Sequence, residues 1–68
     1  MTLKEYRAAV GLSQSQLAKV SGVNLRMIQY YEQGAHDINK AEALTVYKLS
    51  KALNCTMEDL IKENLKEN

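Results

Sequence analysis

This 68-residue sequence has no proline and only one cysteine, one histidine and three glycines. A lone Cys55 cannot form an intrachain disulfide or a thiolate cage for a metal, and one histidine leaves no catalytic or metal-ligating spacing. No apolar run is long enough to cross a membrane, and the first residues lack the charged-then-apolar pattern of a secretion signal. These absences indicate a cytoplasmic protein that is not an enzyme, with no cofactor, metal, membrane or small-molecule ligand expected.

The charge is nearly balanced, and a net charge of +1 is a weak argument for a nucleic-acid partner. Its distribution is more informative. Residues 1–53 hold seven Lys or Arg against four acids, whereas residues 54–68 hold two against four. A C-terminal helix that never meets phosphate has such a composition, and so does an ordinary solvated helix.

Helix ends and starts are marked along the chain. Gly11, Gly22 and Gly34 each follow a segment of helical periodicity, where a helix commonly ends in a left-handed residue. The starts carry residue pairs with capping-box spacing, in which two side chains bond the main-chain amides of a first helical turn. The pairs are Thr2 with Glu5, Ser13 with Gln16, Asn39 with Glu42 and, more loosely, Thr56 with Asp59.

The predicted fold is all-α, a compact five-helix domain that spans residues 1–68. No run alternates with period two for long enough to indicate a strand. The predicted helices lie near residues 3–10, 14–21, 25–33, 40–53 and 57–65. Their apolar spacing predicts a core from Leu3, Tyr6, Val10, Leu17, Val20, Ile28, Tyr31, Leu44, Leu49, Ala52, Leu53, Met57 and Leu60.

One charged residue interrupts this apolar pattern. Arg7 lies between Leu3 and Val10 on the inner face of the first helix. Glu32 leans inward as well, about 40° around its helix from Ile28. Because an unpaired buried charge costs several kcal/mol, we expect Arg7 and Glu32 to form an ion pair. The alternative is that Arg7 extends past the core to solvent.

Residues 14–33 have the composition of two short helices that cross at a tight turn. Ala18 is small enough for the crossing point, and Gly22 supplies a positive φ without steric cost. Val23 fills the corner, and Ile28 faces inward from the second helix. This pattern predicts a helix-turn-helix motif, which presents its second helix to the DNA major groove.

Several separate motifs resemble one known family, the phage-repressor-like helix-turn-helix proteins of the Cro or xenobiotic-response-element type. The matching residues are Gly11 to Gln14, Leu17 with Ala18, Gly22 with Val23, Ile28, Tyr31 to Gly34, Leu49 to Asn54, and Met57 to Leu60. The resemblance implies a lambda-repressor-like DNA-binding domain, commonly a dimeric transcriptional repressor. It also implies the Arg7–Glu32 pair. Tyr31 stands where the family usually has an aliphatic residue, and Leu25 and Met27 stand where polar or small residues are usual.

The outer face of the predicted helix 25–33 is where contacts with bases are expected. Arg26, Tyr30 and Gln33 lie roughly 140–200° from Ile28, and Gln29 lies about 100° away. The guanidinium of Arg26 can bond both guanine O6 and N7, which makes it the leading base reader. Leu25 can touch a thymine methyl or form a shoulder of the core. The base-reading candidates are Leu25, Arg26, Gln29, Tyr30 and Gln33.

Phosphate contacts are expected on both sides of that helix. Ser13 and Gln14 open one helix, where main-chain amides suit an anion, and Asn39 with Lys40 are expected to open another. Asn24 precedes the recognition helix and can cap it or touch the DNA backbone. The alternative for these polar residues is that they cap helices only.

A palindromic operator and a homodimer are expected, because one short helix reads too few base pairs for useful specificity. The segment 57–65 supplies the dimer candidates, Ile61 and Leu65, which remain toward solvent if Met57 and Leu60 face the core. The alternative is that all four residues cover the core.

The sequence therefore favours a sequence-specific regulator that binds double-stranded DNA. The second hypothesis is a protein-interaction or antitoxin-like module with the same fold, which the modest charge and the apolar Leu25 and Met27 support. His36 is interpreted as a solvated loop residue and Cys55 as a buried structural one.

Overall fold

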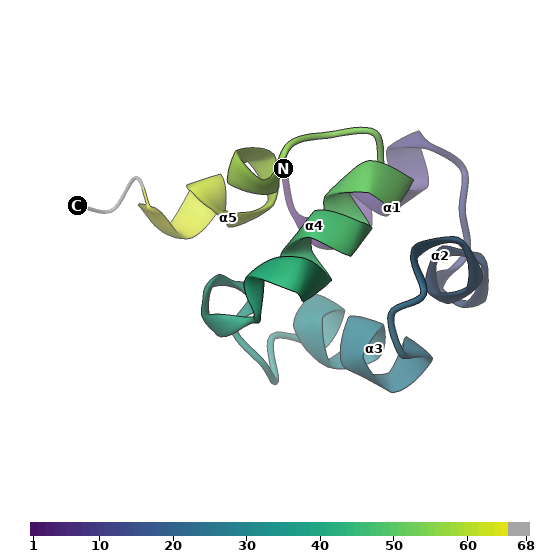
Figure 1. Cartoon of the computed structure of the whole chain (residues 1–68), viewed down its shortest axis with the longest axis horizontal. Helices are drawn as coiled ribbons and strands as arrows, with labels where there is room; N and C mark the ends of the chain where they lie inside the picture. The colour runs from purple at the N-terminus through teal and green to yellow at the C-terminus, as the bar shows by residue number, and fades with distance from the viewer. Residues whose placement is uncertain (66–68) are drawn as a thin grey trace.

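The computed structural model describes residues 1–65, with side chains described as far as Ile61. Its helices are α1 (Leu3–Ala9), α2 (Gln14–Ser21), α3 (Leu25–Gln33), α4 (Ala43–Ala52) and α5 (Met57–Leu65), with a short 3-10 helix, η1 (Ile38–Lys40), before α4 (Figure 1). Within residues 1–65 there is no strand, so the all-α, five-helix prediction is confirmed. In the same range no helix has both the length and the apolar character needed to span a membrane.

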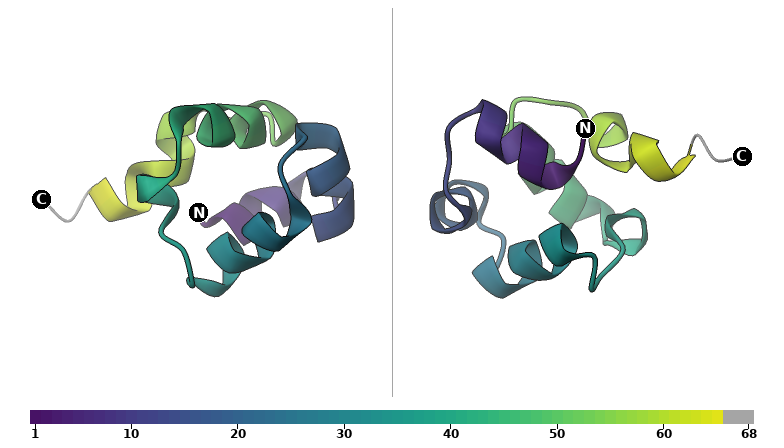
Figure 2. Two further views of the ribbon diagram at one scale, coloured as in Figure 1. Left: turned by 60° about the horizontal axis from the view of Figure 1, so that its bottom comes forward. Right: turned by 180° about the vertical axis from the view of Figure 1, so that it is seen from behind.

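The helices surround one apolar core. In Figure 1, α4 crosses in front of α1, with α2 at the right, α3 below and α5 at the left. Figure 2 shows the same separation of α2 from α5 from two further directions. α2 packs on both α3 and α4, α1 packs on α3, and α5 packs on α4 and η1. The buried apolar side chains are Leu3, Leu17, Val23, Ile28, Val46, Leu49, Leu53 and Leu60.

Three of the four predicted capping boxes are present. The main-chain N–H of Glu5 donates to the Thr2 hydroxyl, and that of Thr2 donates to the Glu5 carboxylate. The same reciprocal bonds join Ser13 with Gln16 and Thr56 with Asp59. Each closes within four residues, so the starts of α1, α2 and α5 follow from local sequence.

The prediction for the start of the fourth helix is wrong. α4 begins at Ala43 rather than at residue 40, and its first turn has no side-chain cap from Glu42. The reason lies two residues upstream of Asn39, where Asp37 accepts the Asn39 N–H over 2.9 Å and starts η1. An aspartate that bonds the backbone two residues on favours a turn over a continuous helix. Asn39 is therefore not a helix cap.

Three predicted core residues are exposed instead. Val10 and Val20 are 41% and 62% exposed, because each lies where its helix ends and the chain turns away from the core. Leu44 is 58% exposed, while Val46, which was not predicted, is buried. These two residues lie about 200° apart around α4, so the inward face is the one that carries Val46. Tyr6, Tyr31, Ala52 and Met57 pack against the core as partly buried residues.

Candidate nucleic-acid interface

The turn between α2 and α3 has the predicted geometry. Gly22 has φ +78°, and its N–H donates to the Ala18 carbonyl over 2.9 Å, which ends α2. Val23 is buried at the corner, and Ala18 packs partly buried against the core. The Asn24 side chain accepts the Arg26 N–H over 2.7 Å and caps α3. Two short helices are thereby held at a fixed crossing, with the far side of α3 directed to solvent.

The outer face of α3 presents polar side chains. Ile28 is fully buried, whereas Arg26 and Gln33 are exposed and Gln29 and Tyr30 are half-buried. Among the described residues, no ion pair or side-chain hydrogen bond engages the Arg26 guanidinium. All five of its N–H donors are therefore available to an external acceptor.

The two apolar residues on α3 differ in their surroundings. Met27 packs partly buried against the core cluster, and it therefore serves as a shoulder of the core. Leu25 is half-buried but does not join that cluster. Part of its side chain remains at the start of α3, next to Arg26, where a contact with a ligand is possible.

An ion pair fastens the inner end of α3 to α1. Arg7 Nε donates to Glu32 Oε2 over 2.6 Å and Arg7 Nη2 donates to Glu32 Oε1 over 3.0 Å. The third donor, Nη1, bonds the Leu12 carbonyl over 2.9 Å. The Arg7 and Glu32 side chains are 14% and 4% exposed, so Arg7 does not extend to solvent. The predicted pair is present in the structure and is bidentate, the geometry that guanidinium and carboxylate prefer.

Glu32 also joins α2 to this pair, which the sequence analysis missed. Gln14 Nε2 donates to Glu32 Oε1 over 2.9 Å, so one carboxylate is bonded from both α1 and α2. Burial by itself raises the pKa of Glu32, but the bonds from Arg7 and Gln14 and the charges of Arg7 and Lys4 bring it below its ordinary value. The hydrogen bond to Glu32 in turn raises the pKa of Arg7. Both groups stay charged at neutral pH.

Some of the side chains proposed to contact phosphate already bond other residues of the chain, and others are exposed to solvent. The Gln14 side chain is bonded to Glu32, so its main-chain amide at the start of α2 is the group left for an anion. Ser13 and Asn24 are exposed caps, and Lys40 is exposed at the end of η1. Asn39 is half-buried, and its Oδ1 atom is buried without a hydrogen-bond partner. Ser13, Gln14 and Asn24 thus lie at the starts of α2 and α3, and Asn39 and Lys40 lie in η1.

The side of α3 opposite α2 carries a contact that sequence reasoning missed. The His36 ring packs edge-on against the Tyr30 ring, with 4.8 Å between centroids and 67° between planes. A second, longer aromatic contact joins His36 to Tyr31 at 6.4 Å. His36 is exposed, as the interpretation of a solvated loop residue requires, but its ring has specific neighbours. Tyr30 and His36 are six positions apart on either side of a turn, and no pattern in the local sequence predicts that their rings meet.

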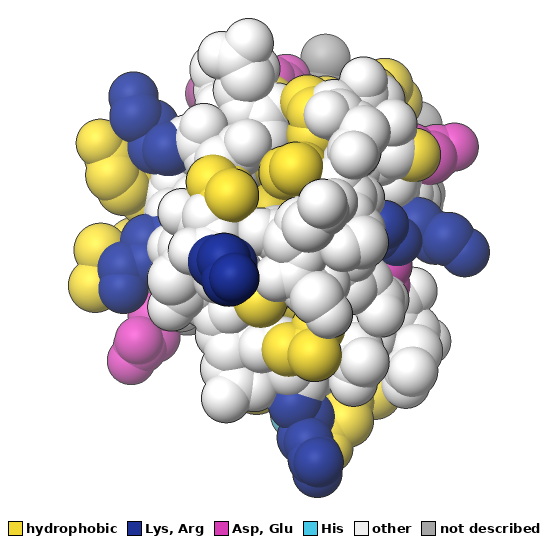
Figure 3. All heavy atoms as spheres, turned by 90° about the vertical axis from the view of Figure 1, so that its right-hand side faces the viewer, with side chains coloured by type: hydrophobic (Ala, Val, Ile, Leu, Met, Phe, Trp, Pro, Cys, Tyr) yellow, Lys and Arg dark blue, Asp and Glu magenta, His cyan; other side chains and the backbone are white. Residues whose placement is uncertain are grey.

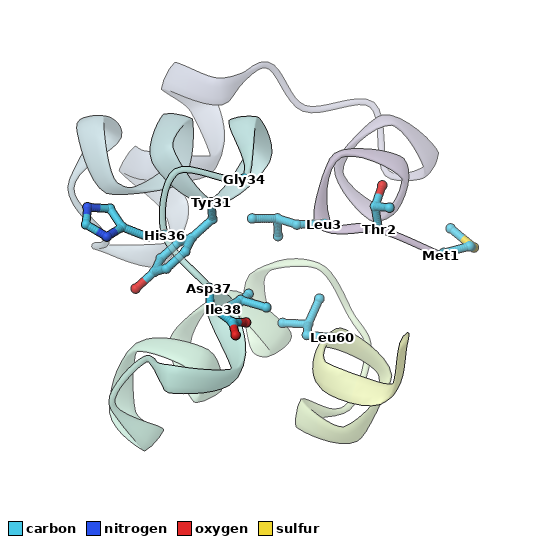
Figure 4. Close-up of a pocket in the computed structure, with 9 residues that line it drawn as sticks. All are labelled: Met1, Thr2, Leu3, Tyr31, Gly34, His36, Asp37, Ile38 and Leu60. Carbon is cyan, nitrogen blue, oxygen red and sulfur yellow. The ribbon is translucent and has the colours of Figure 1, made fainter. Parts of the chain in front are cut away.

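A hollow of about 540 Å³ opens behind the end of α3. It lies between the N-terminus, η1 and α5, and Figure 4 shows Leu3, Ile38 and Leu60 directed into it. No base-reading candidate lines it, so it is separate from the outer face of α3. Its lining residues are Met1, Thr2, Leu3, Tyr31, Gly34, His36, Asp37, Ile38 and Leu60.

The face formed by α2 and the start of α3 has no continuous basic patch. Figure 3 shows Lys and Arg side chains standing apart from one another, with hydrophobic groups between them and acidic groups toward the rim. Cys55 is half-buried, and burial together with the charge of Asp59 raises the pKa of its thiol. Across the described residues, no three His, Cys, Asp or Glu side chains are grouped as a metal site requires.

Comparison with known proteins agrees with this geometry. The sequence model of a helix-turn-helix family, of the xenobiotic-response-element type, matches residues 3–60. The chain belongs to the helix-turn-helix family. A protein of Archaeoglobus fulgidus described as an uncharacterized HTH-type transcriptional regulator is 34% identical over 58 residues, which cover 85% of this chain and 79% of that protein. No solved structure gives a significant match.

Membership in the helix-turn-helix family has a functional meaning. The family is one of DNA-binding transcription regulators rather than a class of enzymes. Within this helix-turn-helix chain, α2 and α3 are the two helices of the motif, and the partner class is double-stranded DNA.

Proposed function

We propose that this chain is a sequence-specific transcriptional repressor that inserts α3 into the major groove of DNA. The observation that carries the proposal is the Arg26 side chain. It is exposed near the start of α3, and no described residue engages its guanidinium. The helix that carries it is fixed from behind by the Glu32 pair. A rigid helix with a free planar donor suits direct readout of guanine.

The other outward side chains of α3 extend this proposed readout. Gln29 would serve adenine or a phosphate, and Tyr30 would contact a thymine methyl or a phosphate. Gln33 lies at the far end of the same face, and the half-exposed Leu25 suits a thymine methyl near the tip. The proposed phosphate contacts flank them and come from Ser13, Gln14, Asn24, Asn39 and Lys40.

We further propose that the repressor acts as a homodimer on a palindromic operator, with α5 at the dimer contact. Ile61 is half-buried against its own core, which leaves part of the side chain open and also supports the alternative that it only covers the core. The Leu65 side chain lies outside the described residues. Replacing both Ile61 and Leu65 with Lys should abolish cooperative filling of a duplex with two half-sites. Unchanged stoichiometry and affinity would remove α5 from the interface.

A protein-interaction or antitoxin-like module is the second candidate, and one observation favours it. Leu44 and Tyr47 are 58% and 49% exposed on the outer face of α4, three residues apart. Neighbouring apolar side chains in solvent are a feature of protein-binding surfaces. Salt dependence separates the candidates, because phosphate contacts make DNA binding weaken steeply with salt.

The deciding experiment is selection of bound duplexes from a random pool, followed by titration of Arg26→Ala. We expect this change to cost about 1–3 kcal/mol on the selected duplex and to relax discrimination at one base position. Lys48→Ala is the matched control, because Lys48 is an exposed cation on α4, away from α3. Equal losses on selected and random duplexes would reduce Arg26 to a phosphate contact. Failure of the wild-type chain to enrich any duplex would overturn the proposal.

A further inference from the structure

The contact between His36 and Tyr30 lies on the proposed DNA-binding face but belongs to no helix pairing of the fold. Tyr30 is on the outer side of α3, and His36 follows the helix by three residues. Their rings meet edge-to-face at 4.8 Å, within the range in which aromatic pairs attract. Neither side chain is part of the buried core.

The backbone explains why the imidazole reaches Tyr30. Gly34 has φ +80°, which reverses the chain at the end of α3. The N–H groups of Ala35 and His36 then both donate to the Tyr30 carbonyl, over 2.9 and 3.3 Å. The loop is therefore tied to the residue whose side chain it contacts, and a non-glycine residue at position 34 would be strained in this turn.

His36 lies at the edge of a shallow hollow of about 560 Å³, between α3 and the segment that leads to α4. Met27 and Tyr31 border it from α3, and Lys40 borders it from η1. His36 therefore borders the same hollow as Lys40, a proposed phosphate contact, while its ring also packs against Tyr30.

We propose that His36 is a positioning residue for Tyr30 and fixes the ring for recognition of one base position. A tyrosine on an open helix face samples several rotamers, and ordering it on binding opposes affinity. Contact with the edge of the His36 imidazole restricts the rotamers of Tyr30 before DNA binds. The inference rests on the proposed function and names a specificity-determining residue outside α3.

A double-mutant cycle tests this proposal on the selected duplex. His36→Ala should weaken binding by about 3- to 10-fold, the cost of ordering one side chain at an interface. It should relax preference at the same base position that Tyr30→Ala relaxes. In the Tyr30→Ala background, the second change should have no further effect on affinity. His36→Phe, which keeps an aromatic edge, should restore most of the lost affinity and preference.

The controls separate positioning from other roles. Because His36 is exposed, the His36 variants should lose no more stability than one aromatic pair provides, and they should stay folded under the assay conditions. Lys40→Ala should weaken selected and random duplexes alike, without a change in base preference. Additive losses in the cycle, or a His36→Phe variant as weak as His36→Ala, would overturn the positioning role alone. A wild-type chain that selects no duplex would overturn this inference together with the proposed function.

Discussion

The two flanks of α3 are held by different kinds of interaction. On the α2 side, the Glu32 carboxylate accepts bonds from Arg7 and Gln14 and is almost fully buried. On the loop side, the exposed His36 ring packs against Tyr30, and the chain continues through the short 3-10 helix η1. The buried Oδ1 atom of Asn39 has no hydrogen-bond partner on that side.

The α2 flank therefore contributes mainly to the stability of α3, and the loop flank is the part that can rearrange more easily. A buried, fully bonded charge network fixes geometry, and breaking it is costly because a charge is left without a partner. An exposed aromatic contact and a short turn are cheaper to rearrange. We therefore expect changes on the α2 flank to appear mainly in folding, and changes on the loop flank to appear mainly in DNA binding.

The largest effect is expected from breaking the ion pair on the α2 flank. Arg7→Ala or Glu32→Ala should each lower the free energy of unfolding by about 3–5 kcal/mol, since the partner charge remains buried. Urea melts measure the loss. Lys48→Ala, which removes an exposed cation on α4, is the control and should stay within about 0.5 kcal/mol of wild type.

The double variant tests whether the loss comes from the pair itself. Arg7→Met combined with Glu32→Leu should recover much of the stability, because neither charge is then buried alone. A cycle in which the two single losses simply add would show that Arg7 and Glu32 are not coupled.

A smaller loss of stability is expected when acid protonates the Glu32 carboxylate of this pair. The pKa of Glu32 in the folded chain lies below its ordinary value of 4.5. Its contribution is therefore complete above about pH 4.5 and is lost as the pH falls through the lower, folded pKa. Urea melts between about pH 5 and about pH 3 should show a shallower loss of stability for Glu32→Gln than for wild type. Parallel pH profiles would contradict the assignment.

The helix caps offer a comparison of the two flanks at the scale of about 1 kcal/mol. Ser13→Ala removes a reciprocal cap of α2 and should cost about 1 kcal/mol. Asp37→Ala removes the cap of the three-residue η1 and should cost less, about 0.5 kcal/mol, because a short turn stabilises little else. Thermal or urea melts of both variants measure the difference. An Asp37 variant less stable than the Ser13 variant would reverse the proposed ranking of the flanks.

The smallest change is expected from a single phosphate contact on the loop flank. Lys40→Ala should make the slope of log affinity against log salt shallower by about 1, with no change in melting. Filter or fluorescence titrations over a range of salt concentrations give that slope. Gln14→Ala, on the other flank, should instead reduce both stability and binding, because its side chain bonds Glu32. An unchanged slope for the Lys40 variant would place it outside the interface.

Features decided within a few residues were predictable from the sequence. The turn at Gly22 and three of the four predicted capping boxes depend on residues no more than four positions apart, and the structure contains them. The Arg7–Glu32 pair spans 25 positions, yet it was predictable because a charged residue interrupted an apolar face and needed a partner. The open outer face of α3 followed from periodicity once Ile28 was placed inward.

Two kinds of feature were not predictable: helix starts at which two side chains compete for the same backbone group, and contacts between segments whose relative positions the sequence does not give. Asn39 matched a capping box with Glu42, but Asp37 bonded the Asn39 N–H and shortened the helix. Apolar spacing also assigned Leu44 to the core, but the buried face of α4 carries Val46 instead. The bond from Gln14 to Glu32 and the contact of His36 with Tyr30 required knowledge of where α2 and the loop lie in space.

The capping boxes also bear on how quickly the chain folds. The first turn is the costly step of helix formation, and at α1, α2 and α5 the cap bonds favour that step from within four residues. Chains dominated by such short-range contacts fold in roughly microseconds to milliseconds. After a transient unfolding event, this domain should therefore refold on that timescale and leave its apolar helix faces open to aggregation only briefly. Stopped-flow or temperature-jump kinetics would show the rate directly.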